Sequence, residues 1–322
     1  MSLTVSELYD FSNITGSVGI EMEVEFSSLH NSTRQRSAIP SGWMAKTDGS
    51  LRNGLEYVLI NPISRTERAL REHLHPMLDA LPSTTIKNAA TASTHVHLNA
   101  RKMSLIDVAS AATVWWLVEP YAIEDCGDER KTNRYAQPFS LNVALAAFNP
   151  KNGNNLFNVD RYQSLNLAAI RKCGSLENRC MRACLDRDDI VRWIRLLCRL
   201  QYDVAVKHHS PLHVIERFTN ARDKKNYIEK LVGGLVKTPL TTEHVDSIEE
   251  RAIELYDFAC LPGRGKTWED WQANVKEKYY TSPRSTSNRM HRATTTLSAG
   301  PQNIPRSTNA QPEDPCDNET EY

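Results

Sequence analysis

The stretch from Val18 to Phe26 reads VGIEMEVEF and alternates strictly between apolar residues and polar or small ones. The side chains of a β-strand point alternately to its two faces, so this pattern predicts a strand with one apolar face. The opposite face carries Glu21, Glu23 and Glu25. A strand of this kind favours an antiparallel sheet that packs against a hydrophobic core on one side.

Further strands are predicted in the first two thirds of the chain. Short alternating or apolar segments predict them at 42–47, 55–60, 93–99 and 175–181. Between them, helical periodicity covers 65–81, where Pro76 is expected to kink or divide the helix. Ser104 and Asp107 form a capping box at the start of a long apolar helix that ends near Ile123.

The second half of the chain is dominated by helical patterns. From Asp186 onward, helices are predicted over about 186–204, 212–219, 222–236, 245–259 and 267–280. The order of elements predicts an α+β fold, with an antiparallel sheet that cradles the functional site, flanking helices and a helical C-terminal half.

The length of 322 residues suggests about two domains, or one domain with an appendage. We expect a core over 1–206, a helical extension packed on it over 207–280, and a disordered tail over 281–322. The last segment has no Phe, Trp or Val and only one Leu and one Ile. A segment of that composition buries too little apolar surface to offset the entropy of ordering it.

Charge and composition restrict the classes of function. The chain has 39 Lys and Arg against 39 Asp and Glu, so its net charge is zero. Neutrality argues against a nucleic-acid partner and against binding to an anionic membrane surface. The chain lacks an apolar run of 18 residues and an N-terminal signal-peptide pattern, and its seven cysteines are irregularly spaced. We therefore expect a cytoplasmic protein with reduced thiols; the sequence leaves the oligomeric state open.

Three of the predicted strands carry a pair of ionisable residues two positions apart. The pairs are Glu21 with Glu23, His95 with His97, and Glu177 with Arg179, and Glu56 adds a charge in a fourth strand. Side chains at i and i+2 project from the same strand face about 6–7 Å apart. Each pair alone also fits a solvated face or a surface ion pair. Together they predict a polar trough on one face of the sheet.

The residue types in this trough suit the handling of phosphates. Clustered carboxylates hold Mg²⁺, which shares its remaining coordination positions with nucleotide phosphates. Arginine supplies planar donors for the charge of a transferred phosphoryl group, and histidine orients a phosphate or completes a metal shell. The combination favours phosphoryl transfer from ATP over simple hydrolysis.

The order of these segments resembles the amidoligase family, within the glutamine synthetase/glutamate–cysteine ligase superfamily. The segments that carry the resemblance are GIEMEVE at 19–25, Trp43 followed by DGSL at 48–51, EYV at 56–58, HVHL at 95–98, Tyr162 with LNL at 165–167, and SLENR at 175–179 followed by Trp193. The resemblance covers about 16–206. The chain departs from the family pattern at Asn178, where the family has an aromatic residue, and at Thr94, where it often has glycine.

The resemblance implies an antiparallel sheet that cradles ATP and Mg²⁺. It also implies ATP-dependent formation of an amide or peptide-like bond between a carboxylate and an amine, each a small molecule or a peptide. We expect the bond to form through an acyl phosphate. The sequence does not identify the two substrates.

We assign roles to the trough residues on this basis. Glu21, Glu23 and Glu56 are expected to hold one or two Mg²⁺ ions that bridge the β- and γ-phosphates. His95 and His97 are expected to line the same nucleotide site.

Two arginines and one more glutamate complete the assignment. Arg179 is expected to stabilise charge during phosphoryl transfer, and Glu177 either ligates metal or orients Arg179. We also expect Arg134 to contact the nucleotide.

Two other functions fit the same residues. His95, His97 and one glutamate are also a suitable transition-metal site for a hydrolase or an oxygenase. Stoichiometric Fe or Zn in a protein indifferent to nucleotide would favour that interpretation. The third alternative is a non-catalytic binding module whose tail acts as an interaction arm. A Glu21→Ala/Glu23→Ala variant with unimpaired biological activity would support it.

Overall fold

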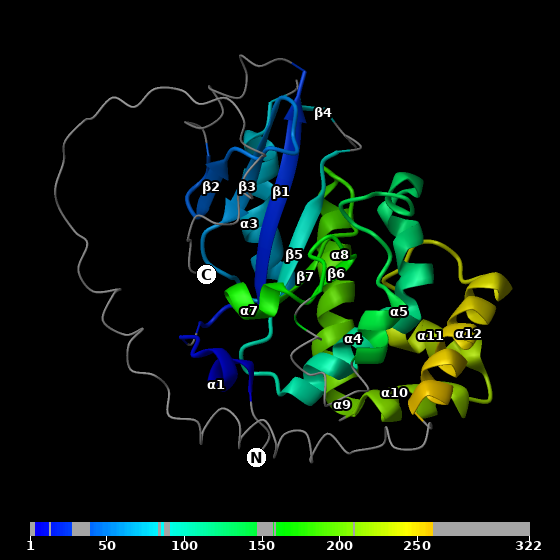
Figure 1. Cartoon of the computed structure of the whole chain (residues 1–322). Coiled ribbons are helices and arrows are strands. Elements are labelled where there is room, and N and C mark those ends of the chain that lie inside the picture. Colours follow the sequence, from blue (N-terminus) through cyan, green and yellow to red (C-terminus); the bar gives the residue numbers. More distant parts are fainter. Residues whose placement is uncertain are drawn as a thin grey trace, which may run out of the picture.

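The computed structural model describes residues 4–12, 14–27, 39–82, 85–86, 91–146, 157, 159–208 and 210–259. The predicted helix at 267–280 and the predicted disordered tail at 281–322 lie outside these residues. Within the described part the chain has an α+β fold, as the sequence predicts (Figure 1).

An antiparallel sheet occupies the N-terminal side of the fold. Its strands are β1 (Val18–Phe26), β2 (Trp43–Lys46), β3 (Gly54–Leu59), β4 (Thr85–Ile86), β5 (Thr94–Asn99), β6 (Leu165–Asn166) and β7 (Ser175–Asn178). They run in the order β2-β3-β1-β5-β7-β6, and the short β4 pairs with the end of β1. All of these pairs are antiparallel. The strand that the alternation at 18–26 predicts therefore lies near the middle of the sheet.

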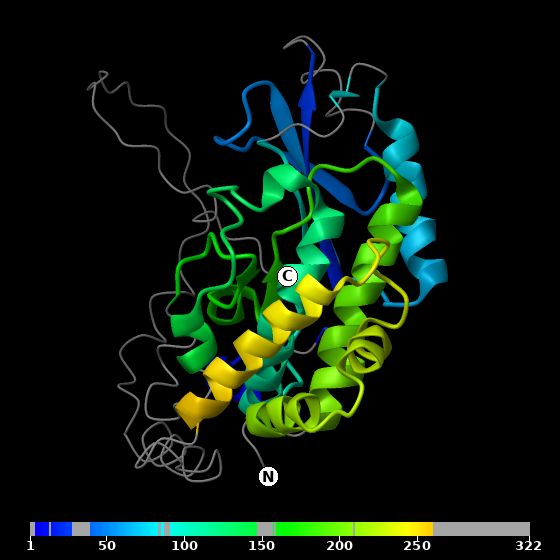
Figure 2. The same ribbon diagram turned by 90° about the vertical axis from the view of Figure 1, so that its right-hand side faces the viewer.

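Helices pack against this sheet and extend away from it. They are α1 (Val5–Tyr9), α3 (Glu67–Ala80), α4 (Leu105–Ala122), α5 (Leu141–Ala146), α7 (Ala169–Cys173), α8 (Arg187–Cys198), α9 (Val206–His208), α10 (Pro211–Thr219), α11 (Lys224–Val232) and α12 (Thr242–Ala259). Two short 3₁₀ turns, η1 (Ile123–Cys126) and η2 (Asp128–Arg130), follow α4. Helices α3 and α8 lie behind the sheet in Figure 1, and Figure 2 shows both on the same side of it.

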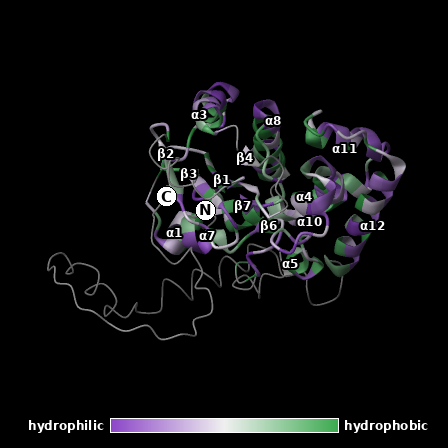
Figure 3. Ribbon diagram, turned by 90° about the horizontal axis from the view of Figure 1, so that it is seen from above, coloured by the Kyte–Doolittle hydropathy of each residue, from purple (hydrophilic) through white to green (hydrophobic). Residues whose placement is uncertain are grey.

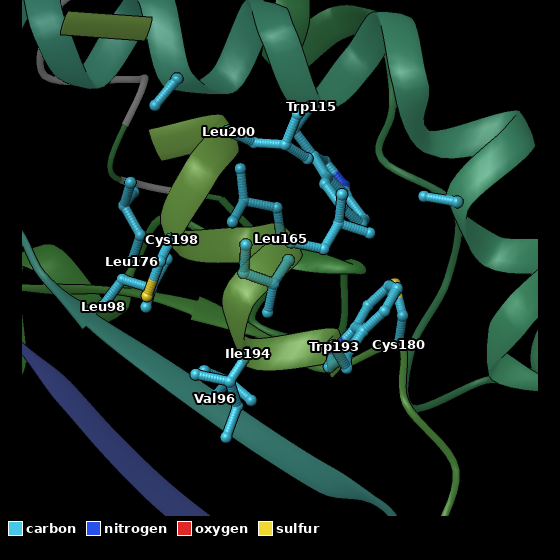
Figure 4. Close-up of a cluster of buried hydrophobic side chains, with 14 of the residues drawn as sticks. Val96, Leu98, Trp115, Leu165, Leu176, Cys180, Trp193, Ile194, Cys198 and Leu200 are labelled. Atoms are coloured by element: carbon cyan, nitrogen blue, oxygen red, sulfur yellow. The ribbon is translucent and has the colours of Figure 1, made fainter. Parts of the chain in front are cut away.

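The apolar face of the sheet packs against these helices. Val18, Ile20 and Met22 of β1 are each at most 1 % exposed. Figure 4 shows Ile194 of α8 beside Val96 of β5. Burial of each large apolar side chain is worth about 1.5–3 kcal/mol, so this layer is a main source of stability.

Helices α5, α9, α10 and α12 pack against α4. Its start has the predicted capping box, in which Ser104 and Asp107 exchange hydrogen bonds. Fifteen of its residues are buried, because α10 and α12 pack against it. Figure 3 shows hydrophilic as well as hydrophobic residues on α3, α8 and α12, as expected for helices that cover a core. In the described part of the chain, no helix is long and apolar enough to span a membrane.

A π-helical segment, η4 (Arg199–Ala205), continues α8 and ties it to the sheet. The hydroxyl of Tyr202 lies 2.8 Å from the carbonyl oxygen of Asn99 and 3.1 Å from that of Ser17. These carbonyls stand at the end of β5 and just before β1. The segment therefore anchors the helical layer at one end of the two central strands.

Two predicted elements differ from the structure. The helix that contains Pro76 is not divided, since α3 runs through it from Glu67 to Ala80. The strand predicted over 175–181 ends at Asn178. The side-chain oxygen of Asn178 accepts a hydrogen bond from the backbone N–H of Cys180, an Asx turn that bends the chain out of the sheet.

A buried carboxylate joins two helical segments and a loop. Asp125 of η1 accepts hydrogen bonds from the backbone N–H groups of Lys237 and Thr238 and from the guanidinium of Arg192 on α8. Burial alone would raise the pKa of Asp125, but these donors outweigh it and lower that pKa. The ionised carboxylate thus connects η1, α8 and the segment before α12.

We expect Asp125→Asn to lower the free energy of unfolding by about 3 kcal/mol, because an amide nitrogen would face two donors and Arg192 would lose the nearer of its charge partners Asp125 and Asp189. Urea denaturation followed by circular dichroism measures this change. Asp128→Asn is the matched control, since the side chain of Asp128 is 94 % exposed and pairs with Lys131 on the surface. The control should stay within about 1 kcal/mol of the wild type. Equal midpoints for the two variants would contradict the role of Asp125.

Candidate functional site

The polar residues of the central strands lie on the sheet face opposite α3 and α8. Val96 faces α8, so His95 and His97, which alternate with it, point the other way. The register places three pairs directly opposite one another: Glu21 with His95, Glu23 with Glu56, and His97 with Glu177. Side chains opposite each other across antiparallel strands have Cβ atoms about 4.5–5.5 Å apart. The trough predicted from the sequence is therefore assembled by strand pairing.

Glu21 lies between the two histidines. Its Oε2 is 3.4 Å from Nδ1 of His95, and its Oε1 is 3.4 Å from Nε2 of His97. Nδ1 of His95 is also 3.6 Å from Oε1 of Glu177. On its other side, His97 places Nδ1 3.0 Å from the hydroxyl of Ser175. Glu21 on β1 thus contacts both histidines of β5.

Two overlapping groups of side chains have metal-ligand geometry. One consists of Glu21, Glu56 and His95, and the other of Glu21, His97 and Glu177; within each group the ligand atoms lie within 4.8 Å of one another. Two carboxylates and one imidazole are a donor set that divalent cations accept. Because Glu21 belongs to both, the two groups form one continuous candidate site.

Glu23, which is also expected to bind the metal, lies beside the first of these groups, with its Oε1 3.8 Å from Nε2 of His95. Its Oε2 accepts hydrogen bonds from the backbone N–H and the hydroxyl of Ser93. The same hydroxyl lies 2.7 Å from Nε2 of His95. In the described chain, Glu23 belongs to neither of the two groups. Its expected role as a metal ligand stays a prediction, and the two groups add Glu177, His95 and His97 as potential ligands.

Glu177 and Arg179 form a buried ion pair at the β7 side of the site. Nη1 of Arg179 donates to Oε1 of Glu177, and Nε donates to the carbonyl of Tyr135 at 3.2 Å. The amide of Asn166 on β6 donates to the other carboxylate oxygen of Glu177 at 2.7 Å. The side chain of Arg179 is 14 % exposed. The guanidinium is therefore held in one orientation beside the second metal-ligand group.

A second buried arginine fixes the backbone of this arrangement. Arg130 is 1 % exposed, and it donates from Nε to the carbonyl of Cys180 and from Nη2 to the carbonyl of Arg179, both at 2.7 Å. The sequence offered no signal for this role, because Arg130 lies in a 3₁₀ turn far from the strand motifs. Arg130 thus holds the backbone of Arg179 and Cys180 in place.

The charges of the site are strongly coupled. Burial, followed by the charge of Glu21, raises the pKa of Glu56 to about 9. Burial would also raise the pKa of Glu21, but His97 and His95 outweigh it and hold that pKa well below its usual value. For His97, burial would lower the pKa, but Glu21 and Glu177 outweigh it and raise it. Without a cation, Glu56 therefore keeps its proton at neutral pH.

Arg134 is separated from the other predicted site residues. Its side chain is exposed and stacks on the ring of Tyr135, with the guanidinium carbon 4.6 Å from the ring centroid. The carbonyl of Tyr135 binds Arg179, so Arg134 stands one residue from the border of the site. The structure brings the remaining predicted residues together on one sheet face and places Arg134 beside them.

Three polar residues of the site were not predicted. Ser93 and Ser175 precede His95 and Glu177 by two positions, so strand alternation places them on the same face. Asn166 lies on the two-residue strand β6, which is too short to show a pattern. Alternation could therefore have revealed the serines but not the asparagine.

In sequence, the chain matches no protein-family model and no curated protein.

Proposed function

We propose that this protein is an ATP-dependent carboxylate–amine ligase that uses Mg²⁺ and forms an amide or peptide-like bond. One observation carries the proposal: Glu21 joins two overlapping carboxylate–imidazole groups next to the buried Glu177–Arg179 pair. This is a cation site beside a fixed guanidinium, the combination that phosphoryl transfer needs. The resemblance to the amidoligase family supports the same reaction through the same residues.

The carboxylates fit a divalent cation. Ligand atoms of Glu21 and Glu56 lie within 4.8 Å of each other, and the pKa of Glu56 is raised first by burial and then by repulsion from the negative charge of Glu21. A divalent cation would relieve this repulsion and displace the proton. Glu21, Glu56 and Glu177 would hold Mg²⁺ through their oxygens. His95 and His97, which contact Glu21, would keep these carboxylates oriented.

The chain's own part in the reaction is positioning and charge stabilisation. Bound MgATP would supply the phosphoryl group that converts the substrate carboxylate into an acyl phosphate, which the amine then attacks. Arg179 would present its planar donors to the charge that develops on the transferred group. Glu177 and the carbonyl of Tyr135 keep Arg179 in place. Most of the rate acceleration would therefore come from groups fixed before the substrates bind.

A screen for ADP and phosphate release tests the proposal. The full chain would be mixed with MgATP and with pooled carboxylates and amines, each pool alone and in combination. Phosphate release that requires a carboxylate and rises with an amine is expected. A protein that binds no ATP, with and without the pools, would contradict the proposal.

The imidazole in each metal-ligand group favours one alternative. The imidazoles of His95 and His97 bind Zn²⁺ and Fe²⁺ more strongly than they bind Mg²⁺. A hydrolase or oxygenase site of that kind would retain about one equivalent of Zn or Fe through purification, and its activity would ignore nucleotide. Metal analysis of the purified protein therefore separates the two functions.

A further inference from the structure

Two turns with nearly the same three-residue sequence lie beside Arg179. Residues 133–135 read Asn-Arg-Tyr and residues 160–162 read Asp-Arg-Tyr. In each, the side-chain oxygen of the first residue accepts a hydrogen bond from the N–H of the tyrosine, at 2.8 and 2.9 Å. Each is therefore an Asx turn that places an arginine next to a tyrosine.

The two turns form one surface, which we term the Arg–Tyr surface (Arg134, Tyr135, Arg161 and Tyr162). The tyrosine rings meet edge to face with their centroids 5.6 Å apart. Each ring is covered by its neighbouring arginine, with guanidinium carbons 4.6 and 4.8 Å from the centroids. The surface thus presents two planar guanidinium groups stacked on two tyrosine rings. All four side chains are at least partly exposed.

Backbone hydrogen bonds hold this surface in register with the proposed phosphoryl-transfer site. Gln137 donates from its N–H to the carbonyl of Tyr162 at 2.7 Å, and Ser164 donates to the carbonyl of Gln137 at 2.6 Å. Ser164 in turn accepts from the N–H of Arg179 at 2.9 Å. The Arg–Tyr surface is therefore a fixed neighbour of Arg179.

We infer that the Arg–Tyr surface binds the adenosine and α-phosphate end of the nucleotide whose terminal phosphates lie between the metal-ligand groups and Arg179. This inference rests on the proposed function. A ligand of this surface must carry negative charge to pair with the two arginines. It must also have a flat group that stacks on the guanidinium and tyrosine ring planes. A nucleotide meets both conditions, whereas an aliphatic dicarboxylate uses only the charges.

The test compares binding of MgATP with binding of magnesium tripolyphosphate, which lacks the adenosine. Isothermal titration calorimetry would be run on the full chain, on Arg134→Gln/Arg161→Gln, and on Arg222→Gln as the matched control. Arg222 is exposed in the loop between α10 and α11. The wild type should bind MgATP more tightly than tripolyphosphate. The double variant should lose about tenfold in MgATP affinity and a clearly smaller factor in tripolyphosphate affinity, because tripolyphosphate keeps a phosphate contact with the arginines but lacks the adenosine that stacks on them.

Each other result overturns the inference in an identifiable way. Unchanged MgATP affinity in the double variant would show that the surface does not contact the nucleotide, and the proposed function would stand. Equal losses for both ligands would assign the arginines to the triphosphate instead of the adenosine. A wild type that binds neither ligand would overturn the proposed function and the inference together.

Discussion

Replacing Glu21 by glutamine is expected to lower ATP-dependent phosphate release by about 10³-fold or more. Glu21 contributes to both metal-ligand groups, so its loss would weaken both of these candidate cation sites. A bound metal ion provides several kcal/mol of charge stabilisation, and each 1.4 kcal/mol is about tenfold in rate. The measurement is ADP release in a coupled assay with the substrate pair found in the screen. Binding of Mn²⁺, followed by electron paramagnetic resonance, gives a second readout that needs no substrate.

Glu25→Gln is the matched control for Glu21→Gln. Glu25 lies on the same strand face, but its carboxylate accepts hydrogen bonds from the hydroxyl of Thr91 and the N–H of Arg52. It belongs to neither group of potential metal ligands within the described residues. The control should keep activity and Mn²⁺ affinity to within about threefold. A folded Glu21→Gln protein with wild-type rate and wild-type Mn²⁺ binding would contradict the metal site.

Replacing Arg179 by lysine is expected to lower kcat by about 10²–10³-fold, with a much smaller change in the KM for ATP. Lysine keeps the charge but cannot hold Glu177 and the carbonyl of Tyr135 at the same time with a planar group. Removing one fixed donor to developing charge costs about this much in other enzymes. Steady-state kinetics with saturating MgATP separates the two constants.

The control for Arg179→Lys is Arg171→Lys on α7, whose side chain is exposed. We expect unchanged kcat and KM there. If Arg179→Lys raised the KM for ATP and left kcat unchanged, Arg179 would bind the ground state only. The assignment of charge stabilisation to this residue would then be wrong.

Much of the sheet could be predicted because its pattern is local. The alternation at 18–26 predicts β1 to the residue, and the segments at 42–47 and 55–60 predict β2 and β3 within one residue at each end. The capping box likewise locates the start of α4. Burial on one face imposes a period of two on a strand, and an N-cap requires a specific side chain, so both leave a signal in the sequence.

Other elements left no such signal. The strands β4 and β6 have two residues each, and the Asx turn at Asn178 that ends β7 depends on a side-chain hydrogen bond. Pro76 was expected to kink or divide α3, and of these two effects the division does not occur, because the helix continues through it. Propensity is a weak guide where tertiary packing stabilises an element, as it does for α3 against α8.

The candidate site shows the same division. Spacing of two along a strand predicted that Glu21, His95, His97, Glu177 and Arg179 face one trough, and the structure brings them together. The sequence could not predict that Glu23 binds Ser93 instead of joining the metal-ligand groups. It also did not predict the role of Arg130, because the hydrogen bond from Arg130 to the carbonyl of Cys180 links a turn to the end of β7 fifty residues away.

By itself, the sequence determined the α+β class, the central strand and the polar face that carries the candidate site. These follow from periodicity, which neighbouring residues set among themselves. Only the tertiary structure decided which polar residues meet, because strand register and loop position bring together residues far apart in the chain. It therefore decided that Glu21 is shared by two groups, that Arg179 is held by the Tyr135 carbonyl, and that two Asx-Arg-Tyr turns form one surface beside it.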